Sequence, residues 1–455
     1  MTGPGSPFAV RGVIEGFYGN PWTHEQRLEL IEFIAARQMN TFVYAPKDDR
    51  LVRRDWRVPY EGPELLRLAE LAERCRRHDV TFVYCLSPGL SIRYAEPADA
   101  EAVCAKLDSV GGLGIASFGL LLDDIPAELQ HPGDRAAFDD LVEGQIVLVG
   151  KVAGHLGPER RLIVCPTRYW GAGNEPEIRR LGQAIDPRID LFWTGRAICS
   201  PTLDLDDAAT FARTTARPVT YWDNYPVNDA AMTHELHIGP YRGRDPQLWR
   251  FATGIVANGM ELFESSKIAL VTIADYLAAP ETYDPETSWQ RALHDVVGAA
   301  DVDAFTLFAD NVRSSCLATE DAPLVTAALE AFAFRTEQGD HAGAAADLGA
   351  LADRLLAAAD HLLRGPVANP VLVEEARPWI ASFEVGAQAL RRMADLAAEG
   401  RLDTDGPSEL LPYLRRLRRA RVRVFGDAVD MMLADVTGTH PRPGDFTWIE
   451  EGGGS

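Results

Sequence analysis

Hydrophobic and polar positions follow two alternating patterns along the first part of the chain. Short runs rich in β-branched and aromatic residues are separated by longer segments in which apolar residues recur every third or fourth position. The short runs predict β-strands and the longer segments predict amphipathic helices. The predicted strands cover residues 9–15, 41–45, 80–86, 115–122, 161–165, 190–193, 219–222 and 254–257.

The alternation of strands and helices predicts a parallel sheet closed into a barrel. The clearest predicted helices cover residues 25–37, 63–78, 98–107 and 265–277. Strands that alternate with helices favour a parallel arrangement, and eight such units in about 270 residues are typical of a (β/α)₈ TIM barrel. A doubly wound open sheet is the alternative, but no GxGxxG or GxxxxGK[ST] motif follows the first predicted strand. The predicted fold class is therefore α/β.

The pattern changes at the segment PETYDP, residues 280–285. Beyond it the chain is rich in Ala, Leu and Arg with helical periodicity, so we expect an all-α C-terminal domain. The expected domains are a catalytic barrel at 8–283, a helical domain at 284–445 and a flexible tail at 446–455. The basic stretch LRRLRRARVR (414–423) fits a solvated amphipathic helix better than a nucleic-acid contact.

Charge and cysteine usage narrow the class of protein. The net charge of −22 argues against nucleic acid or an anionic membrane as the main partner. No window reaches the 18 apolar residues of a membrane span, and the first ten residues lack the regions of a secretory signal. The six cysteines form no CxxC pair, which is typical of buried thiols in a reducing compartment. We therefore expect a cytoplasmic protein.

Polar and aromatic residues gather where the predicted strands end. In a TIM barrel the loops that follow the strands build the active site. Hydrogen-bonding groups and an aromatic face together suit a sugar. The candidate residues at these ends are Gly16, Lys47, Asp123, Asp124, Tyr169, Trp222, Asn224, Asp229 and Asn258.

The pair Asp123-Asp124 follows a strand that ends in three leucines. It has three interpretations: a solvated loop start, ligands for a hard cation, or a general acid/base pair. Adjacent residues diverge from one backbone point, so they do not flank a glycosidic bond from opposite faces. They suit a reaction in which the substrate supplies the nucleophile, one Asp orients that substrate group, and the other serves the leaving oxygen.

Eight motifs give the chain a resemblance to glycoside hydrolase family 84, the retaining β-N-acetylglucosaminidases that include the O-GlcNAcases. The resemblance extends over residues 9–312. The motifs are GVIEGFYGNPW (12–22), MNTFVYAPKDD (39–49), SPGL (87–90), LLLDDI (120–125), CPTRY (165–169), WTG (193–195), YWDNYPVND (221–229) and ANGMELFESSKIA (257–269).

The resemblance implies substrate-assisted catalysis, in which the 2-acetamido carbonyl attacks the anomeric carbon and forms an oxazoline. Asp123 would polarise the acetamido N–H, Asp124 would be the general acid and base, and Tyr169 would help hold the acetamido group. It implies no metal or cofactor, a GlcNAc-bearing substrate, and by analogy a homodimer through the helical domain. Trp222 would line the acetamido pocket, and the sugar hydroxyls would be held by Gly16, Lys47, Asn224, Asp229 and Asn258.

Two departures and several open alternatives accompany the resemblance. Arg168 stands where relatives usually have Glu, and Gly259 follows Asn258 where many have Pro. The segment HELH (234–237) is not the zinc motif HExxH. Asp48 and Asp49 could serve as capping or rim acids, and Trp56, Tyr60 and Trp170 as core or pocket residues. As alternatives to the enzyme, an inactive sugar-binding relative or a divalent-metal hydrolase remain open.

Overall fold

The computed structural model describes residues 5–439, which form two compact units. The first unit contains the described residues up to Val227 together with Arg242–Phe263 and Ile273–Asp284. The second contains Asn228–Tyr241, Glu264–Thr272 and the described residues from Pro285 onward. Two segments that precede the expected boundary at 283/284 thus group with the helical unit. The domain boundaries stay predictions, and the expected tail at 446–455 lies outside the described residues.

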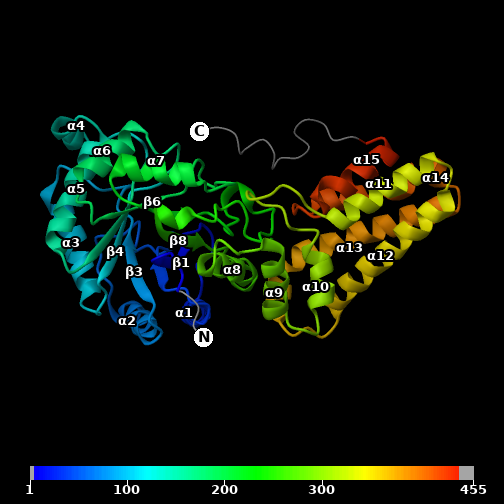
Figure 1. The fold of residues 1–455 in the computed structure, drawn as a ribbon, viewed down its shortest axis with the longest axis horizontal. Coiled ribbons are helices and arrows are strands. Elements are labelled where there is room, and N and C mark those ends of the chain that lie inside the picture. The colour runs from blue at the N-terminus through cyan, green and yellow to red at the C-terminus, as the bar shows by residue number, and fades with distance from the viewer. Residues whose placement is uncertain (1–4, 440–455) are drawn as a thin grey trace. The chain divides into compact units, whose positions relative to one another are not determined.

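The first unit is built on a closed barrel of eight parallel strands, which confirms the predicted fold class (Figure 1). Each strand pairs with its neighbours in chain order, and β8 closes the barrel on β1. The strands are β1 (Val10–Glu15), β2 (Thr41–Tyr44), β3 (Thr81–Leu86), β4 (Ser117–Leu121), β5 (Arg161–Cys165), β6 (Asp190–Trp193), β7 (Val219–Asp223) and β8 (Ala252–Asn258).

Helices connect consecutive strands of the barrel (Figure 1). The first begins at a capping box, in which the Thr23 hydroxyl accepts from the backbone N–H of Gln26 while the Gln26 side chain accepts from the backbone N–H of Thr23. The helices between strands are α1 (His24–Ala35), α2 (Gly62–Arg77), α3 (Pro97–Gly111), α4 (Pro132–Ala137), α5 (Leu141–Leu156), α6 (Pro176–Ala184) and α7 (Leu205–Thr215). Two short 3₁₀ helices, η1 (Ala230–Met232) and η2 (Leu248–Arg250), precede β8, and α8 (Phe263–Ala278) follows it.

The barrel interior is filled by an apolar cluster to which every strand contributes. Because side chains on a strand alternate between its two faces, every second residue points inward. This cluster forms the floor beneath the carboxyl ends of the strands. Its buried members are Ile14, Val43, Ala45, Val83, Cys85, Leu121, Cys165, Phe192, Trp222 and Val256.

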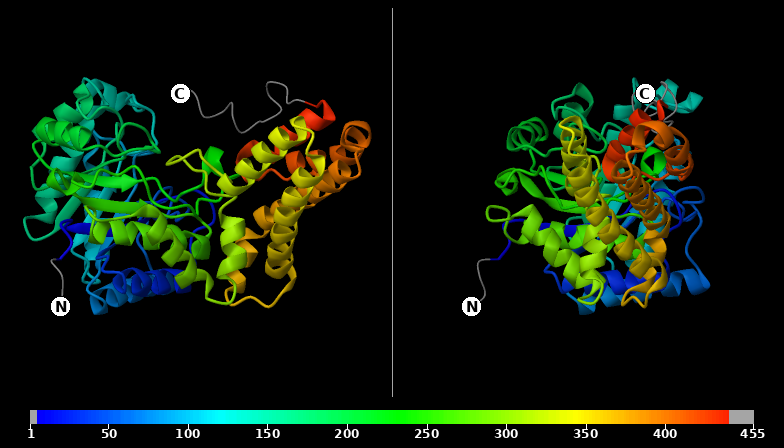
Figure 2. Two further views of the ribbon diagram at one scale, coloured as in Figure 1. Left: turned by 45° about the vertical axis from the view of Figure 1, so that its right-hand side comes forward. Right: turned by 90° about the vertical axis from the view of Figure 1, so that its right-hand side faces the viewer.

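In the second unit, the regular elements among the described residues after 284 are helices, apart from one isolated β-bridge between Ser315 and Ala318. The long helices α12 and α13 run side by side in both views of Figure 2. In the basic stretch 414–423, Leu414 is buried while Arg418 pairs with Asp430. The helices are α9 (Pro285–Val297), α10 (Val302–Ala309), α11 (Pro323–Glu337), α12 (His341–Arg364), α13 (Pro370–Ala398), α14 (Leu402–Arg419), η3 (Phe425–Asp427) and α15 (Ala428–Thr437).

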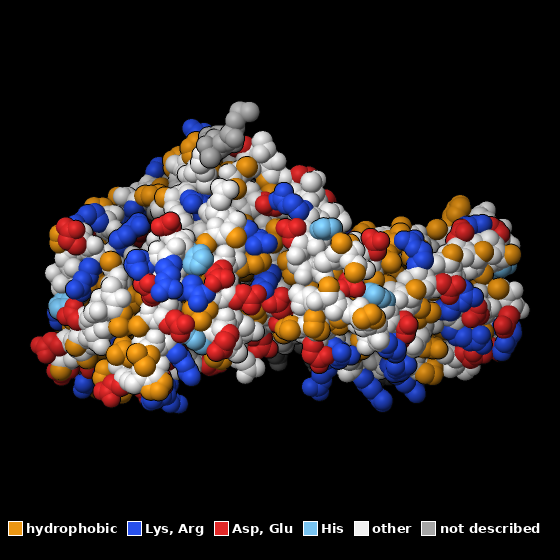
Figure 3. Space-filling model, turned by 90° about the horizontal axis from the view of Figure 1, so that it is seen from below, with side chains coloured by type: hydrophobic (Ala, Val, Ile, Leu, Met, Phe, Trp, Pro, Cys, Tyr) orange, Lys and Arg blue, Asp and Glu red, His pale blue; other side chains and the backbone are white. Residues whose placement is uncertain are grey.

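On the face shown in Figure 3, acidic and basic side chains are interspersed. Many acidic and basic side chains of the described residues form ion pairs, such as that between Arg76 and Glu73 on α2. None of the helices within residues 5–439 is both long and apolar enough to cross a membrane. All six cysteines are free thiols, and Cys75, Cys85 and Cys165 are buried.

Candidate active site

The site residues continue the inward-facing alternation of the barrel strands. Positions two apart on a strand share a face. Ala45 and Leu121 belong to the interior cluster. Lys47 comes two positions after Ala45, and Asp123 comes two positions after Leu121. The same step from an interior residue leads to Gly16, Asn224 and Asn258. The strand pattern therefore brings these five positions to the carboxyl-terminal opening of the barrel.

The charged centre of the site is a buried lysine beside two neighbouring aspartates. Lys47 Nζ lies 2.5 Å from Oδ2 of Asp123 and 3.3 Å from Oδ2 of Asp124. The side chains of Lys47 and Asp123 are only 3% and 5% exposed, whereas that of Asp124 is 30% exposed. Burial lowers the pKa of Lys47, but the charges of Asp123 and Asp124 outweigh burial and raise that pKa above its ordinary value. Lys47 is therefore an ammonium at neutral pH.

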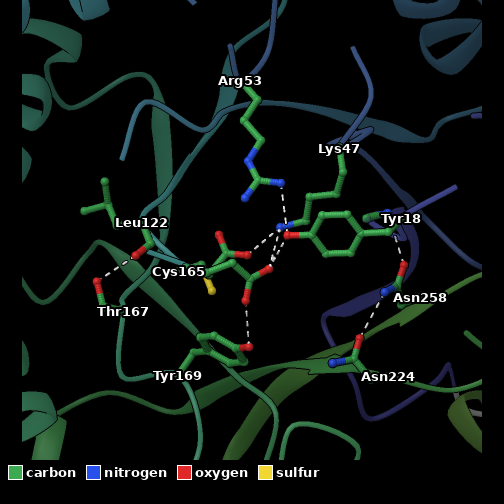
Figure 4. Close-up of polar contacts among 12 residues, drawn as sticks. Tyr18, Lys47, Arg53, Leu122, Cys165, Thr167, Tyr169, Asn224 and Asn258 are labelled. Atoms are coloured by element: carbon green, nitrogen blue, oxygen red, sulfur yellow. Dashed lines mark hydrogen bonds and ion pairs between the residues drawn. The ribbon is translucent and has the colours of Figure 1, made fainter. Parts of the chain in front are cut away.

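The backbone at Asp124 has an uncommon conformation. Its φ of 52° lies in the left-handed region, which Asp tolerates better than most residues. Its carboxylate accepts hydrogen bonds from the hydroxyls of Tyr18, at 2.8 Å, and Tyr169, at 3.0 Å. Figure 4 shows Tyr18, Lys47 and Tyr169 converging on one point from three loops. Burial opposes ionisation, but Lys47 and the two tyrosines lower the pKa of Asp124 below its ordinary range.

The two tyrosines remain protonated donors to this carboxylate. Burial and the adjacent charge of Asp124 both raise the pKa of Tyr169 well above its ordinary value. Burial likewise raises the pKa of Tyr18, and Asp124 adds to the effect while Lys47 opposes it. In the free protein Asp124 is therefore a carboxylate held by neutral donors and one ammonium.

Two buried polar atoms of the predicted site residues have no hydrogen-bond partner among residues 5–439. One is Oδ1 of Asp123, an acceptor, and the other is Nε1 of Trp222, a donor. An unpaired buried polar atom destabilises the folded state by about 1–3 kcal/mol, so such atoms are uncommon and require an explanation. A bound polar group that donates to Asp123 would supply the missing partner for its oxygen.

A chain of amides lines the side of the site formed by β1, β7 and β8. The backbone N–H of Gly16 donates to Oδ1 of Asn258 at 3.1 Å, and Nδ2 of Asn258 donates to Oδ1 of Asn224 at 3.0 Å (Figure 4). A Cβ at Gly16 would lie 2.4 Å from the ring of Trp222. Glycine at position 16 is therefore required for the indole to occupy its place.

One predicted site residue falls in the other unit. Asp229 belongs to the segment Asn228–Tyr241, which groups with the helical unit, and it stands at the N-terminus of η1. Its assignment to the sugar-binding set stays a prediction.

Two acidic residues within the motifs have structural surroundings. Glu15 is completely buried and forms a bidentate ion pair with Arg27 of α1. Asp49 accepts hydrogen bonds from the hydroxyls of Tyr44 and Tyr60 and from the backbone N–H of Leu51. These carboxylates fasten the loops after β1 and β2, which carry Tyr18 and Lys47 respectively.

The three aromatic residues left undecided by the sequence differ in burial. Trp56 and Tyr60 are buried, and the indole of Trp56 donates to the hydroxyl of Ser91. Trp170 is half-buried, and the guanidinium carbon of Arg168 lies 4.3 Å from its ring centroid. Trp56 and Tyr60 are therefore core residues, while the unusual Arg168 stacks on its neighbour Trp170 on the loop that carries Tyr169.

The HELH segment has a different environment from a zinc site. His237 is buried and its Nε2 lies 3.0 Å from Oε2 of Glu235, which also pairs with Arg423. Within the described residues, no group of three or more His, Cys, Asp or Glu side chains is arranged to hold a metal ion.

Sequence reasoning passed over two residues that reach the site. Tyr18 lies within the motif GFYG and bonds to Asp124, and Arg53 donates to the Tyr18 hydroxyl at 3.0 Å. Arg53 stands in an irregular loop with no strand register to indicate its direction. For Arg53, the one signal available in the sequence was its closeness to the motif APKDD.

Comparison with known proteins places this geometry in a family. The family model described as beta-N-acetylglucosaminidase matches residues 11–310. Protein O-GlcNAcase from Rattus norvegicus and from Mus musculus are each 33% identical over 271 residues. Each alignment spans 58% of this chain but only 29% of the relative's length.

Two solved structures share the fold over nearly the whole chain. An O-GlcNAc hydrolase from Thermobaculum terrenum, solved as a variant with one Asp-to-Asn substitution, superposes with a TM-score of 0.89 and 32% identity, over 95% of this chain and 94% of that one. A structure of CpGH84B superposes with a TM-score of 0.84 and 25% identity, over 95% and 77% of the respective chains. The resemblance drawn from the motifs is thus confirmed: the chain belongs to the β-N-acetylglucosaminidase family, glycoside hydrolase family 84.

Proposed function

We propose that the protein is a retaining exo-β-N-acetylglucosaminidase, O-GlcNAcase-like, that removes terminal β-linked GlcNAc with assistance from the substrate. The observation that carries this proposal is the buried, unpartnered Oδ1 of Asp123. The other oxygen of that carboxylate is taken by Lys47. An acetamido N–H donating to Oδ1 would complete the set of hydrogen bonds, and Asp123 would then draw charge toward the nitrogen and make the carbonyl oxygen a better nucleophile.

In the first step of the proposed reaction, the acetamido carbonyl oxygen bonds to the anomeric carbon as the glycosidic bond breaks. Asp124 transfers its proton to the leaving oxygen, and the sugar is left as an oxazoline stabilised by Asp123. In the second step Asp124 takes a proton from water as the water oxygen bonds to the anomeric carbon and the oxazoline reopens. Two displacements give net retention.

The surroundings of Asp124 suit a group that works in both protonation states. In the free protein the neighbouring donors favour the carboxylate. Binding of an aglycone over its 30% exposed side chain would remove solvent and favour the protonated acid. Tyr169, which bonds to Asp124, is placed to steady it in both steps.

The remaining site residues would bind the sugar. Trp222 would line the acetamido pocket, and Lys47, Asn224 and Asn258 would hold hydroxyls, with the backbone of Gly16. The assignment of Asp229 to the same role rests on the family resemblance. The substrate class is a GlcNAc-bearing glycoconjugate. Cytoplasmic location, in keeping with six free thiols, and a homodimer through the helical domain stay predictions.

The test is hydrolysis of an aryl β-GlcNAc with and without EDTA, with the aryl β-glucoside as control. We expect turnover of the GlcNAc substrate alone, unchanged by EDTA. Loss of turnover in EDTA would instead support a divalent-metal hydrolase. Tight GlcNAc binding without turnover would indicate a sugar-binding relative that no longer hydrolyses.

A further inference from the structure

A relay of two hydrogen bonds leads from Arg53 to Asp124. Nη1 of Arg53 donates to the hydroxyl oxygen of Tyr18 at 3.0 Å, and that hydroxyl donates to Oδ2 of Asp124 at 2.8 Å. A phenol carries one proton, so an N–H donated to its oxygen leaves that proton free to point at the carboxylate. Figure 4 shows Arg53 and Tyr18 meeting at the hydroxyl. Arg53 therefore directs the Tyr18 proton toward Asp124.

The guanidinium also controls the ring of Tyr18. Its carbon lies 5.3 Å from the ring centroid, on a ring that Lys47 Nζ approaches to 5.5 Å. Tyr18 is 39% exposed, so packing alone holds its side chain weakly. Contacts with Arg53 at both the hydroxyl and the ring fix the direction from which Tyr18 reaches Asp124.

Arg53 is presented by a well-anchored loop. Its backbone N–H donates to the carbonyl of Asp49, whose side chain is held by Tyr44 and Tyr60. The carbonyl of Val52 accepts from the backbone N–H of Ser87 at the end of β3. The backbone of this loop is thus held by its own turn and by the end of β3, which limits where the guanidinium can go.

The charge of Arg53 is not neutralised by a carboxylate of its own. Its neighbours Arg50 and Arg54 both pair with Asp55, whereas no carboxylate in residues 5–439 lies within ion-pair distance of Arg53. Its Nε is buried and has no partner in the same part of the chain. A positive charge that donates to a tyrosine hydroxyl, with no carboxylate beside it, polarises that hydroxyl as a donor.

We propose that Arg53 is a positioning residue for the acid/base carboxylate, acting through the hydroxyl of Tyr18 to orient Asp124 and to set its proton affinity. This rests on the proposed role of Asp124. The charged and titratable groups around Asp124 are Lys47, Asp123, Tyr18, Tyr169 and the buried thiol of Cys165, with Arg53 behind Tyr18. Arg53 does not contact Asp124 directly; it is linked to the Asp124 carboxylate through the hydroxyl of Tyr18.

The expected effect has a definite sign. Without Arg53 the Tyr18 proton is no longer directed, so Asp124 loses a donor to its ionised form and binds its proton more tightly. The basic limb of the pH profile of kcat/KM reports the free enzyme's acid, so it moves to higher pH in Arg53→Gln. We also expect kcat to fall about tenfold in Arg53→Gln while KM changes little, because Arg53 acts on the acid/base through Tyr18 and is not itself assigned to the sugar.

The experiment compares pH profiles of Arg53→Gln, Tyr18→Phe and the double variant on an aryl β-GlcNAc. If Arg53 acts through Tyr18, both single variants shift the basic limb upward and the double variant is no worse than Tyr18→Phe. Losses that multiply in the double variant would overturn the proposal. Thermal unfolding of each variant checks that the fold is retained, and Tyr18→Phe preserves the ring if Arg53→Gln unfolds.

Two controls separate this proposal from its alternatives. Arg54→Gln removes the same charge one residue away, from a side chain that is 75% exposed and paired with Asp55. An equal shift in Arg54→Gln would mean a general charge effect and would overturn the relay. If the pH profile of Arg53→Gln is not shifted while Asp124→Asn still depends on the leaving group, the relay is overturned and the proposed function stands. Insensitivity of Asp124→Asn would overturn the proposed function together with it.

Discussion

The ammonium of Lys47 lies 2.5 Å from Oδ2 of Asp123, and both side chains are almost entirely buried. Each of these two buried charges is stabilised by the other, because neither is solvated by water. The pair explains why one oxygen of Asp123 is occupied and the other is available to a ligand. Lys47 therefore has a structural part in the site besides any contact with sugar.

Lys47→Met is predicted to destabilise the protein, because it leaves the Asp123 carboxylate buried without its partner. Removing one member of a buried ion pair lowers the free energy of unfolding by about 3–5 kcal/mol. The double variant Lys47→Met/Asp123→Asn should recover part of this loss, because the second change removes the stranded charge. Denaturant unfolding measures the free energy of unfolding of each variant. A loss in the double variant equal to the sum of the losses in the two single variants would contradict the prediction.

Asp124→Asn is predicted to depend on the leaving group. An activated aryl leaving group needs little protonation, so the loss should be about tenfold or less there and about 100-fold or more with a poor leaving group. Asp123→Asn, at the neighbouring position, is the matched control. Its activity should fall about 100-fold with both kinds of leaving group, because Asp123 acts on the nucleophile. Steady-state kinetics over a series of aryl substrates distinguishes the two. Equal losses at Asp124 across the series would rule out its acid role.

Gly16→Ala is predicted to displace Trp222, because the new methyl would lie 2.4 Å from the indole. A displaced wall of the acetamido pocket should raise KM and lower kcat/KM by about tenfold or more. Gly150→Ala, on α5, is the control because its Cβ would meet nothing within 4 Å. Steady-state kinetics on an aryl β-GlcNAc measures KM and kcat/KM for both variants. Similar values for Gly16→Ala and Gly150→Ala would refute a packing role for Gly16.

The strands and the inward-facing site positions could be predicted from sequence, because alternation by two is a local property. Residues 161–165 and 190–193 were predicted with the ends that the structure has. Lys47 and Asp123 follow from the same alternation. Glycine at 16 and a large aromatic at 222 are visible in the sequence, but their contact joins β1 to β7 and has no local signal.

Other features depend on long-range contacts. Arg53 and Tyr18 are 35 residues apart and meet through two irregular loops. The segments Asn228–Tyr241 and Glu264–Thr272 group with the helical unit although they lie between barrel elements in sequence. Periodicity describes how a segment is built and not which unit it joins, so the position of Asp229 could not be anticipated.

Asp321, in the helical unit, is predicted to make stability depend on pH. Burial raises the pKa of its carboxyl to about 6, above the ordinary 3.8. The native state then holds its proton more tightly than the unfolded state, so stability is full below about pH 4 and decreases as pH rises through about 6. Asp321→Asn should therefore raise Tm at pH 8 but not at pH 4. Calorimetry at both values checks this, and an equal change at both would count against it.

In the proposed reaction the substrate's own acetamido group is the nucleophile, and Asp123 orients it. The most direct measurement is kcat/KM for aryl β-GlcNAc substrates whose N-acetyl group carries none, one, two or three fluorine atoms. Fluorine withdraws electrons from the carbonyl oxygen and weakens it as a nucleophile, so the account predicts a steep fall along the series. Rates that stay constant from acetyl to trifluoroacetyl would contradict it and assign the attack to a group of the protein or to water.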